Sequence, residues 1–358
     1  MRKRIYMSAK RTMRAAMFHG PKNVVLEDTE IPLINDDEIL VKVKAATTCG
    51  TDRKLYLRPG KKYPSYFKPP TIFGHEIAGE IYEIGKNVSG YEVGQPVFVH
   101  DSGPCLKCFY CKIGRHSLCE NITWNWGTWT EYLRVPKEII QCGNMVPFDT
   151  KKLSFAEAAL TEPLSCVLMG VERSNIGLGD TVVINGAGPI GLFWTNLVRN
   201  KGAKIIQVDI KQDRLDLAKK LGADIVLNAK DEQDIIQAVK DHTDEGRGAD
   251  IAVEAIGYPE TWETTIKMAR KGGLVNLFGG PPPTSSISIN TSLLHYNELT
   301  IIGVFHTTPR YVQAAINLLA NRKINTDIFI TEHLKLDELD KILDNLVNQK
   351  GIKTAIIP

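Results

Sequence analysis

Residues 181–191 read TVVINGAGPIG, a short β-branched run followed by a glycine-rich turn. The glycines have the spacing G-x-G-x-x-G, and the next residues, LFWTNLVRN, are typical of a helix. The first glycine allows a tight turn, the second lets a pyrophosphate approach the backbone, and the third lets helix and strand pack closely. The amides of the helix N-terminus would face the phosphates. The stretch therefore predicts a dinucleotide site at Gly186, Gly188, Pro189, Ile190 and Gly191.

An acidic residue stands at the distance from this turn that such a site requires. Asp209 ends the apolar run KIIQVD, about 20 residues downstream. A carboxylate at this position can accept hydrogen bonds from the ribose hydroxyls and would repel a 2′-phosphate, which favours NAD over NADP. Lys211 weakens that repulsion slightly. A glycine-rich turn without a cofactor is the alternative, but strand, glycines, helix and acid together favour a dinucleotide.

The region around this motif alternates between strand and helix patterns. Six apolar runs are separated by helical stretches, as expected for an open parallel sheet that is covered on both faces. Residues 165–305 are therefore predicted to form a doubly wound α/β domain of Rossmann type. The six runs are TVVING, KIIQVD, DIVLN, DIAVEAIG, GLVNLFGG and ELTIIGVF.

The segments on either side of this region have a different pattern of predicted secondary structure. Residues 13–164 read as short strands punctuated by Gly and Pro, which predicts a β-rich domain. Residues 306–358 contain two helical stretches and a final strand, KTAIIP, and are expected to return to that first domain. Residues 1–12 are basic and are expected to be a flexible, solvated extension; a nucleic-acid arm or a targeting tag is the alternative.

Composition limits the classes of partner. The 358 residues are 43% hydrophobic, and 44 basic residues against 41 acidic ones leave a net charge of +3. Because the charges are interspersed, the sequence offers no concentrated basic face for nucleic acid or an anionic membrane. No apolar run approaches the ~18 residues of a membrane span. A small-molecule partner and a cytoplasmic location are expected.

Four of the seven cysteines lie within 15 residues, in SGPCLKCFYCKIGRHSLCE. Their spacing, C-x2-C-x2-C-x7-C, favours metal over disulfides, and four thiolates complete a tetrahedral zinc site with no open position. An iron–sulfur cluster is the alternative. A nucleic-acid-binding zinc ribbon is disfavoured because the segment has no concentrated basic face. The predicted structural zinc ligands are Cys105, Cys108, Cys111 and Cys119.

A second, looser set of metal-binding residues is spread over three segments. Cys49 stands in CGTD, His75 and Glu76 in GHE, and Glu162 in TEPLSC. One thiolate, one imidazole and a carboxylate form the mixed set of a catalytic zinc with an exchangeable position. Each residue could instead have an ordinary structural role: Cys49 as a core thiol, His75 as a turn histidine and Glu162 as a carboxylate on a helix surface.

Together these motifs resemble the zinc-containing medium-chain dehydrogenases, within them the sorbitol, polyol and threonine dehydrogenase branch. The resemblance runs from about Met13 to Pro358. It implies a GroES-like catalytic domain interrupted by a Rossmann domain, two zinc ions per chain and NAD(H). The motifs are GHEIAGEIYEIGKNVSGYEVGQPVF, the four-cysteine segment, CGTD, EPLS, GAGPIG and VDIKQDRLDLAKKLGAD.

The resemblance also assigns roles to single residues. Cys49 and His75 match the first two catalytic zinc ligands, and either Glu76 or Glu162 would approach the metal at a given time. Thr51 matches the hydroxyl that relays the substrate proton. Arg214 matches an arginine near the adenosine, although it also reads as a plain helix surface charge.

Two departures bear on the substrate. The relatives' histidine after CG(S/T)D-x is replaced by Lys54, which makes threonine-type chemistry less certain. The stretch GVFHT places His306 where sorbitol-type relatives have arginine, so the substrate is predicted to differ from sorbitol. A solvent-exposed loop histidine is the alternative. His306, Tyr56 and Trp124 are predicted to contact substrate, and Trp126 is a further pocket candidate.

The sequence thus predicts an enzyme that oxidises a secondary alcohol, such as a polyol, cyclitol or sugar acid, to a ketone by hydride transfer. A threonine-type amino-alcohol dehydrogenase and a primary-alcohol or aldehyde enzyme are the alternatives within this class. A cofactor-binding protein without catalysis is disfavoured because Cys49, Thr51 and His75 are all present. A homotetramer is expected, with the apolar strand ELTIIGVF pairing across a dimer interface.

Overall fold

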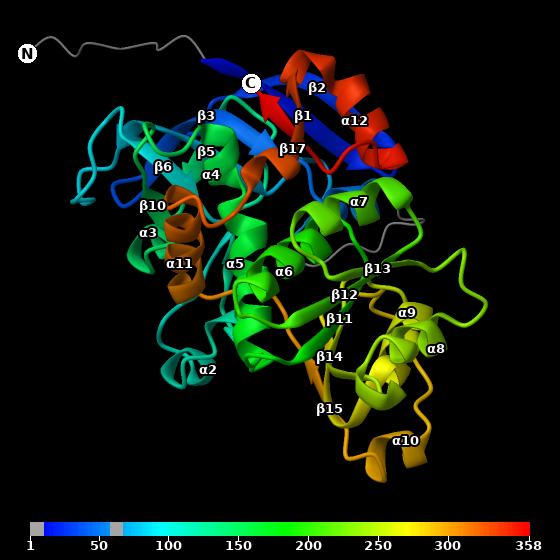
Figure 1. Ribbon diagram of the computed structural model, residues 1–358. Coiled ribbons are helices and arrows are strands. Elements are labelled where there is room, and N and C mark those ends of the chain that lie inside the picture. Colours follow the sequence, from blue (N-terminus) through cyan, green and yellow to red (C-terminus); the bar gives the residue numbers. More distant parts are fainter. Residues whose placement is uncertain (1–10, 58–66) are drawn as a thin grey trace, which may run out of the picture. The chain divides into compact units, whose positions relative to one another are not determined.

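The computed structural model describes residues 11–57 and 67–358 (Figure 1). Most of the expected N-terminal extension lies outside the described residues, but Thr12 already belongs to strand β1 (Thr12–Gly20). The chain divides into two compact units. The first contains the described residues up to Glu162, with Ile316–Asn321 and Phe329–Pro358, and the second contains Pro163–Ala315 and Arg322–Ile328.

The division differs from the predicted one after residue 305. Residues 306–315 and 322–328 belong to the second unit rather than returning to the first. One cause is local, because helix α11 (Pro309–Ala320) starts soon after the last strand of the second unit. Its Arg310 guanidinium and Tyr311 hydroxyl both hydrogen-bond the Glu172 carboxylate in that unit.

The first unit is built mainly on antiparallel strands, with one parallel pair at the end of its main sheet. Among its described residues, seven strands form one sheet in the order β10-β6-β5-β3-β18-β17, with β9 also paired to β3. The last strand of the chain, β18, is thereby inserted beside β3, which joins the two ends of the sequence in one sheet. The seven strands are β3 (Ile39–Thr47), β5 (Glu76–Ile84), β6 (Pro96–Val99), β9 (Tyr132–Val135), β10 (Met145–Pro147), β17 (Ile330–Lys335) and β18 (Lys353–Ile357).

Two smaller sheets and short helices complete this unit. Strand β1 pairs with β2 (Asn23–Glu30) and β4 (Thr71–Ile72), and β7 (Ser102–Gly103) pairs with β8 (Thr123–Trp124). Helix α12 covers an apolar core that includes β1 and aromatic residues from the loops. The helices of this unit are α1 (Gly50–Leu57), α2 (Phe109–Lys112), η1 (His116–Leu118), α3 (Lys137–Gln141), α4 (Phe155–Ala159), η4 (Leu336–Glu338) and α12 (Leu339–Asn348).

The second unit holds a parallel sheet in the order β13-β12-β11-β14-β15-β16. The order reverses between β11 and β14, which is the position where doubly wound sheets bind ligands at their carboxyl edge. All five residues of β11 are buried, as expected for a central strand that is covered on both faces. The strands are β11 (Thr181–Asn185), β12 (Lys204–Asp209), β13 (Ile225–Asn228), β14 (Ala249–Glu254), β15 (Ala269–Leu277) and β16 (Thr300–Gly303).

Helices cover both faces of this sheet. Figure 1 shows α8 and α9 together on one side of the strands, and their apolar residues share a core with β14 and β15. Right-handed crossovers put α6 and α7 on the opposite face. The helices are α6 (Pro189–Arg199), α7 (Gln212–Lys220), α8 (Ile235–Asp241), η2 (Asp244–Gly246), α9 (Pro259–Met268), α10 (Thr291–His295) and η3 (Thr326–Ile328), and α5 (Thr161–Arg173) begins in the first unit.

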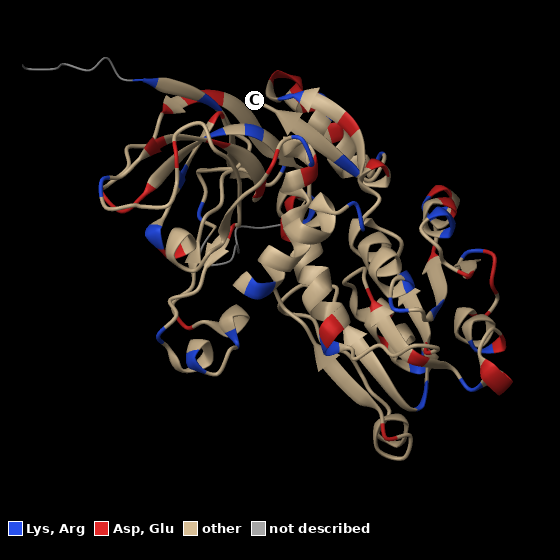
Figure 2. Cartoon of the chain, turned by 60° about the vertical axis from the view of Figure 1, so that its left-hand side comes forward, with Lys and Arg blue, Asp and Glu red and all other residues tan. Residues whose placement is uncertain are grey.

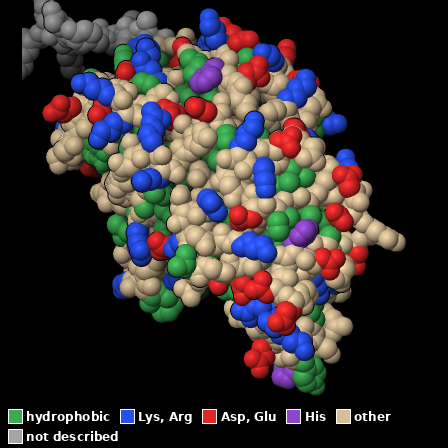
Figure 3. Space-filling view, in the orientation of Figure 1, with side chains coloured by type: hydrophobic (Ala, Val, Ile, Leu, Met, Phe, Trp, Pro, Cys, Tyr) green, Lys and Arg blue, Asp and Glu red, His purple; other side chains and the backbone are tan. Residues whose placement is uncertain are grey.

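The surface carries both signs of charge throughout. Lys and Arg alternate with Asp and Glu along the described helices and loops (Figure 2). The face in Figure 3 likewise mixes basic and acidic side chains over both halves of the picture. In the described part of the chain, no helix combines the length and apolar character needed to cross a bilayer.

Candidate active site and cofactor site

Helix α1 positions the first candidate metal ligand. Cys49 immediately precedes the helix, and the Asp52 carboxylate accepts a hydrogen bond of 2.9 Å from the Cys49 amide. The other oxygen of the same carboxylate lies 3.0 Å from His75 Nδ1. Asp52 is fully buried. It therefore fixes both the backbone of the thiol residue and the orientation of the imidazole, leaving Nε2 for a metal.

A glycine and two tryptophans shape the surroundings of His75. Gly74 has φ +86°, and a Cβ atom there would lie 2.1 Å from the Trp129 ring, so no other residue fits without rearrangement. The Trp126 ring stacks on the imidazole with the centroids 4.5 Å apart and an interplanar angle of 26°. Burial is the largest single effect and lowers the pKa of His75, but the charges and hydrogen bonds of Asp52 and Cys49 together outweigh it and raise that pKa well above its usual value.

The structure brings Cys49, His75 and Glu76 together. One potential ligand atom from each lies within 4.8 Å of the others, although 26 residues separate the thiol from the imidazole in the sequence. Residues 75 and 76 share this cluster because β5 starts beside β3, the strand that leads to the thiol. This thiol, imidazole and carboxylate are the donor types of a catalytic zinc site.

Glu76 also makes an ion pair that the sequence did not predict. The Nζ atom of Lys353, from β18, lies 2.8 Å from each oxygen of the Glu76 carboxylate. The same ammonium donates to the Thr48 carbonyl at 2.6 Å, and the Thr47 hydroxyl donates to the carboxylate. Lysine and glutamate are both buried. A metal ion that binds to the Glu76 carboxylate must therefore compete with the Lys353 ammonium.

Two more buried acids adjoin this cluster. Burial, followed by the charge of Asp101, raises the pKa of Glu162 to about 8. Burial also raises the pKa of Asp101 to about 7, and the charge of Glu76 adds to this effect. Together with Asp52, four buried carboxyl groups gather near one buried lysine. Such an excess of acids out of water is costly unless a cation compensates it, so the residues fit a divalent metal ion.

The four-cysteine segment forms a second cluster. All four sulfur atoms lie within 4.8 Å of one another, and backbone amides donate to Cys119 Sγ from Cys105 at 3.2 Å and from Asn121 at 3.4 Å. None of the seven cysteines forms a disulfide. A hydrogen bond from the Lys107 amide is the main cause that lowers the pKa of Cys105 to about 6. A tetrahedral zinc fits this set of four sulfur atoms.

The glycine turn in the second unit has the geometry that its sequence predicts. Gly186 has φ +111°, and a Cβ at Gly191 would lie 1.8 Å from the Gly186 carbonyl oxygen. Helix α6 begins at Pro189 with Gly188 at its N-cap. The close approach of helix and strand thus requires both outer glycines, and the first turn of α6 presents its amides at the carboxyl edge of the sheet.

Asp209 and Arg214 lie beside this turn. The Asp209 carboxylate accepts hydrogen bonds from the Ala187 amide at 2.6 Å and from two amides that follow it, Ile210 and Lys211. Arg214 Nη1 is 3.7 Å from the position that a Cβ at Gly188 would occupy. Its Nε atom is buried and has no hydrogen-bond partner among the described residues. The arrangement fits a dinucleotide, whose ribose and phosphate groups offer partners to both side chains.

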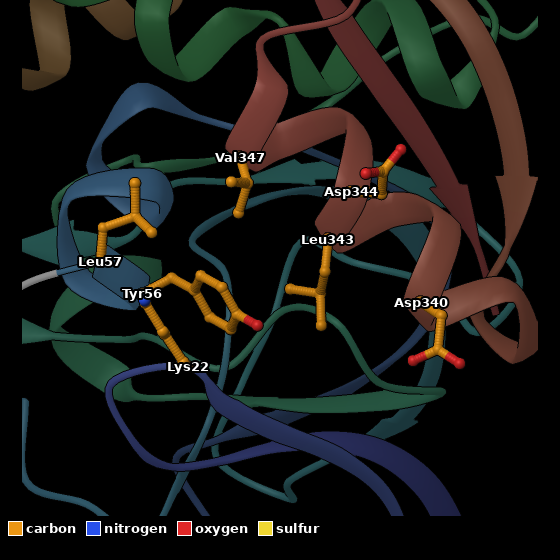
Figure 4. Close-up of a pocket in the computed structure, with 7 residues that line it drawn as sticks. All are labelled: Lys22, Tyr56, Leu57, Asp340, Leu343, Asp344 and Val347. Carbon is orange, nitrogen blue, oxygen red and sulfur yellow. The ribbon is translucent and has the colours of Figure 1, made fainter.

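The remaining predicted residues are placed as follows. Thr51 is exposed in the first turn of α1, and Trp124 is half-buried in β8, opposite Ser102. Tyr56 lies in a pocket of about 370 Å³ between α1 and α12 (Figure 4). No candidate zinc ligand is among the seven residues that line this pocket. Those residues are Lys22, Tyr56, Leu57, Asp340, Leu343, Asp344 and Val347.

His306 follows β16 by three residues, at the carboxyl end of the sheet. It is half-buried and has φ +62°, an uncommon conformation for a residue other than glycine. Its ring packs near Phe305, with centroids 5.7 Å apart. It belongs to the second unit, whereas the predicted domain boundary assigned it to the first.

Sequence reasoning missed three members of the first cluster. Asp52 was visible in CGTD, where an acid three residues after a cysteine can accept the hydrogen bond of its amide. Asp101 and Lys353 had no such local signal. Lys353 in particular is 277 residues from Glu76, and only the pairing of β18 with β3 brings the two into one sheet.

Comparison with known proteins identifies the family. Residues 35–143 match the alcohol dehydrogenase GroES-like domain, and residues 189–321 match the zinc-binding dehydrogenase domain. The sorbitol dehydrogenase of Bacillus subtilis (strain 168) is 31% identical over 354 residues, which cover 97% of each chain. The chain therefore belongs to the zinc-binding, medium-chain alcohol dehydrogenase family, and the predicted family and fold class are confirmed.

Two further relatives extend the comparison. The L-threonine 3-dehydrogenase of Pyrococcus horikoshii is 35% identical over 315 residues, 87% of this chain and 88% of the relative. A solved structure from Sinorhizobium meliloti 1021, provisionally described as a zinc-binding dehydrogenase and bound to NADP, is 28% identical. It has a TM-score of 0.86 and covers 98% of this chain and 100% of its own. The chain is thus a zinc- and nicotinamide-dependent oxidoreductase that acts on alcohols.

Proposed function

We propose that this enzyme oxidises a polar secondary alcohol, such as a polyol, a cyclitol or a sugar acid, to the ketone, with NAD as the hydride acceptor. The observation that carries the proposal is the cluster of the half-buried Cys49 with the buried His75 and Glu76, amid an excess of acids. A mixed set of one thiolate, one imidazole and one carboxylate is the ligand set of a catalytic zinc that keeps an exchangeable position, whereas four thiolates close a structural site.

The chain's own residues would hold and orient the reacting groups. Cys49, His75 and one of the two glutamates would hold the zinc, which when bound would supply Lewis acidity toward the substrate hydroxyl. Asp52 fixes the imidazole through Nδ1. Lys353 holds the Glu76 carboxylate through a buried ion pair.

Thr51 completes the set as the proton relay. Its position in the first turn of α1, two residues after Cys49, leaves the side chain exposed. It would accept the proton of the substrate hydroxyl and pass it to solvent, while the carbinol hydride reduces NAD to NADH. The carbinol carbon loses two electrons with the hydride and becomes the ketone carbon.

NAD is favoured over NADP by Asp209. Its carboxylate lies directly under the glycine turn, where a 2′-phosphate on the adenosine ribose would face it. Because a solved structural relative is bound to NADP, the preference of this chain for NAD or NADP has to be measured.

A threonine-type dehydrogenase is the second candidate. The identity to the threonine dehydrogenase of Pyrococcus horikoshii, 35%, favours it. Lys54, which stands where many relatives have histidine, argues against it. Lys54 is exposed on α1, so packing in the core does not dictate a lysine at this position.

The deciding experiment is a substrate panel. Purified, zinc-loaded protein would be assayed for NADH formation with polyols, cyclitols, aldonic acids, threonine and simple secondary alcohols. A polar secondary alcohol should have the highest kcat/KM. A clear preference for threonine, for a primary alcohol or for NADP as the cofactor would contradict the corresponding part of the proposal.

The assembly and location follow from the same residues. We infer a homotetramer built from dimers, with small-molecule substrate and no nucleic-acid or membrane partner. The support is the edge position of β16 in its sheet, together with the interspersed surface charge. We infer a cytoplasmic location because none of the seven cysteines forms a disulfide, and five of them belong to the two candidate zinc sites.

A further inference from the structure

Glu254, the last residue of β14, is a fully buried acid at the carboxyl edge of the parallel sheet. It pairs in register with Asn185, the residue directly before the glycine turn. It thus stands in the reversal point between β11 and β14, where a doubly wound sheet binds its ligand. Neither the metal sites nor the glycine motif accounts for a buried carboxyl group at this position.

The side chain of Glu254 organises the loop that follows it. One carboxyl oxygen, Oε1, accepts hydrogen bonds from the Ile256 amide at 3.1 Å, the Gly257 amide at 2.8 Å and the Thr261 hydroxyl at 2.6 Å. Thr261 lies in the first turn of α9. A single oxygen therefore ties the loop after β14 to the beginning of the next helix.

The backbone of Glu254 holds a second loop at the same edge. Its carbonyl accepts hydrogen bonds from the amides of Phe278 at 3.1 Å and Gly279 at 2.9 Å, which follow β15. A Cβ at Gly279 would lie 2.4 Å from Glu254 Oε2 and 2.4 Å from the Gly257 nitrogen. The two loops are thus packed tightly around the carboxyl group.

The organised loop in turn contacts the glycine turn. The Ala255 amide donates to the Asn185 carbonyl at 2.9 Å, which extends the pairing of β14 with β11 past the strand end. A Cβ at Gly186 would lie 2.6 Å from Ile256 Cγ1 and 3.2 Å from the Ala255 carbonyl oxygen. The loop therefore forms one wall of the space above the turn.

We infer that Glu254 is a positioning residue for the nicotinamide cofactor, because its buried carboxyl group holds the loop Ala255–Gly257 against the glycine turn. The inference rests on the proposed NAD-linked function. Loss of the carboxyl group leaves three donors without their acceptor, and the loop then adopts other conformations, most of which do not match the cofactor.

The test compares variants at the two ends of the same strand. In E254A, the dissociation constant for NADH, measured by fluorescence titration of the full chain, should rise at least about tenfold, as expected for the loss of one or two buried hydrogen bonds. E254Q keeps an acceptor oxygen, so its dissociation constant for NADH should stay within about threefold of the wild-type value.

The control is D250A. Asp250 accepts hydrogen bonds from the Thr181 amide and Arg270 Nε at the opposite edge of the sheet. D250A should lower Tm while leaving the NADH constant within about threefold of wild type.

Each outcome bears on one claim. NADH binding of E254A equal to that of wild type, or an equal loss in D250A, would overturn the positioning role. If E254A does not fold, T261V decides. This variant removes one donor to Oε1 and should weaken NADH binding about fivefold, beyond the threefold margin of the controls, without loss of the fold; NADH binding of T261V within that margin would count against the inference. Wild-type protein that does not bind NADH would instead contradict the proposed function.

Discussion

Two glutamates near the candidate zinc ligands differ in their partners, and this difference assigns them different roles. Lys353 already neutralises the Glu76 carboxylate from 2.8 Å. Burial, with the charge of Asp101 added to it, raises the pKa of Glu162 to about 8, so ionisation of this carboxyl group is unfavourable unless a cation binds to it. The Glu162 carboxylate would therefore stabilise a bound cation more than the Glu76 carboxylate, which already has the Lys353 ammonium as its partner.

Glu162→Gln is predicted to weaken zinc binding at the catalytic site at least about tenfold, because the metal loses a charged ligand. Glu76→Gln is predicted to lower the free energy of unfolding of the zinc-free protein by ~3 kcal/mol, because Lys353 is left buried without its partner. Chelator competition measures the first quantity and denaturant unfolding the second. If Glu76→Gln loses the zinc while Glu162→Gln retains it, the assignment is reversed.

Asp209 provides the residue-scale prediction for the cofactor. Asp209→Ala removes the ribose hydrogen bonds and the repulsion of a 2′-phosphate together, so KM for NAD should rise about tenfold, equivalent to ~1.4 kcal/mol. KM for NADP should change less or fall. Steady-state kinetics with both cofactors measures the ratio. Asp213→Ala, on the exposed side of α7, is the control and should leave both values unchanged. A wild-type preference for NADP would refute the role of Asp209.

At the scale of elements, the four-cysteine segment has little core of its own. Among its side chains, Leu106, Phe109, Ile113 and Leu118 are exposed large hydrophobics. The segment contains only the short helices α2 and η1. A bound zinc would therefore be the main source of its stability.

Cys108→Ser is predicted to release one zinc per chain and to lower the free energy of unfolding by about 2 kcal/mol or more, a fall in Tm of roughly 4 °C or more. Cys142→Ser is the matched control, since this half-buried thiol lies outside the cluster and donates only to the Ile139 carbonyl. Metal analysis and calorimetry provide the measurements. Iron in place of zinc, or an unchanged Tm after release of the metal, would argue against a structural zinc.

His306 follows β16 and therefore lies at the carboxyl edge of the parallel sheet. Because doubly wound sheets bind their ligands at this edge, the position supports a role in substrate selection. His306→Ala should lower kcat/KM for the best polar substrate by an amount equivalent to ~1 to 3 kcal/mol, because a buried hydrogen bond is lost. A simple secondary alcohol should be affected much less. Equal losses on both substrates, or none on either, would show that His306 does not select the substrate.

Elements built from local patterns could be predicted from the sequence, whereas contacts between distant strands could not. The glycine spacing and strand–helix alternation predicted the parallel sheet, because each βα unit is contiguous in the sequence. The four cysteines were predictable for the same reason. The ion pair of Lys353 with Glu76 depends on the insertion of β18 beside β3, and the segment 306–315 departs from its predicted domain because α11 contacts Glu172.

At the scale of the whole molecule, the open question is how many copies assemble. β16 ends the sheet of the second unit, and its two isoleucines, Ile301 and Ile302, are only half-buried. Tyr296, shortly before the strand, is 75% exposed. An edge strand with unpaired backbone groups and apolar side chains is an aggregation liability when it is left open. Pairing with the same strand of a second copy closes the edge with two-fold symmetry.

Wild-type protein is therefore predicted to be a tetramer made of dimers, with β16 at the dimer interface. Ile302→Lys should shift the population to smaller species, because pairing would bury two unpartnered charges at the symmetric contact. Leu178→Lys is the control: Leu178 is 88% exposed on a loop of the same unit, and its replacement should leave the assembly unchanged. Multi-angle light scattering across a concentration series measures the mass. A monomeric wild type would reject the prediction, and a tetrameric Ile302→Lys variant would place the interface elsewhere on the chain.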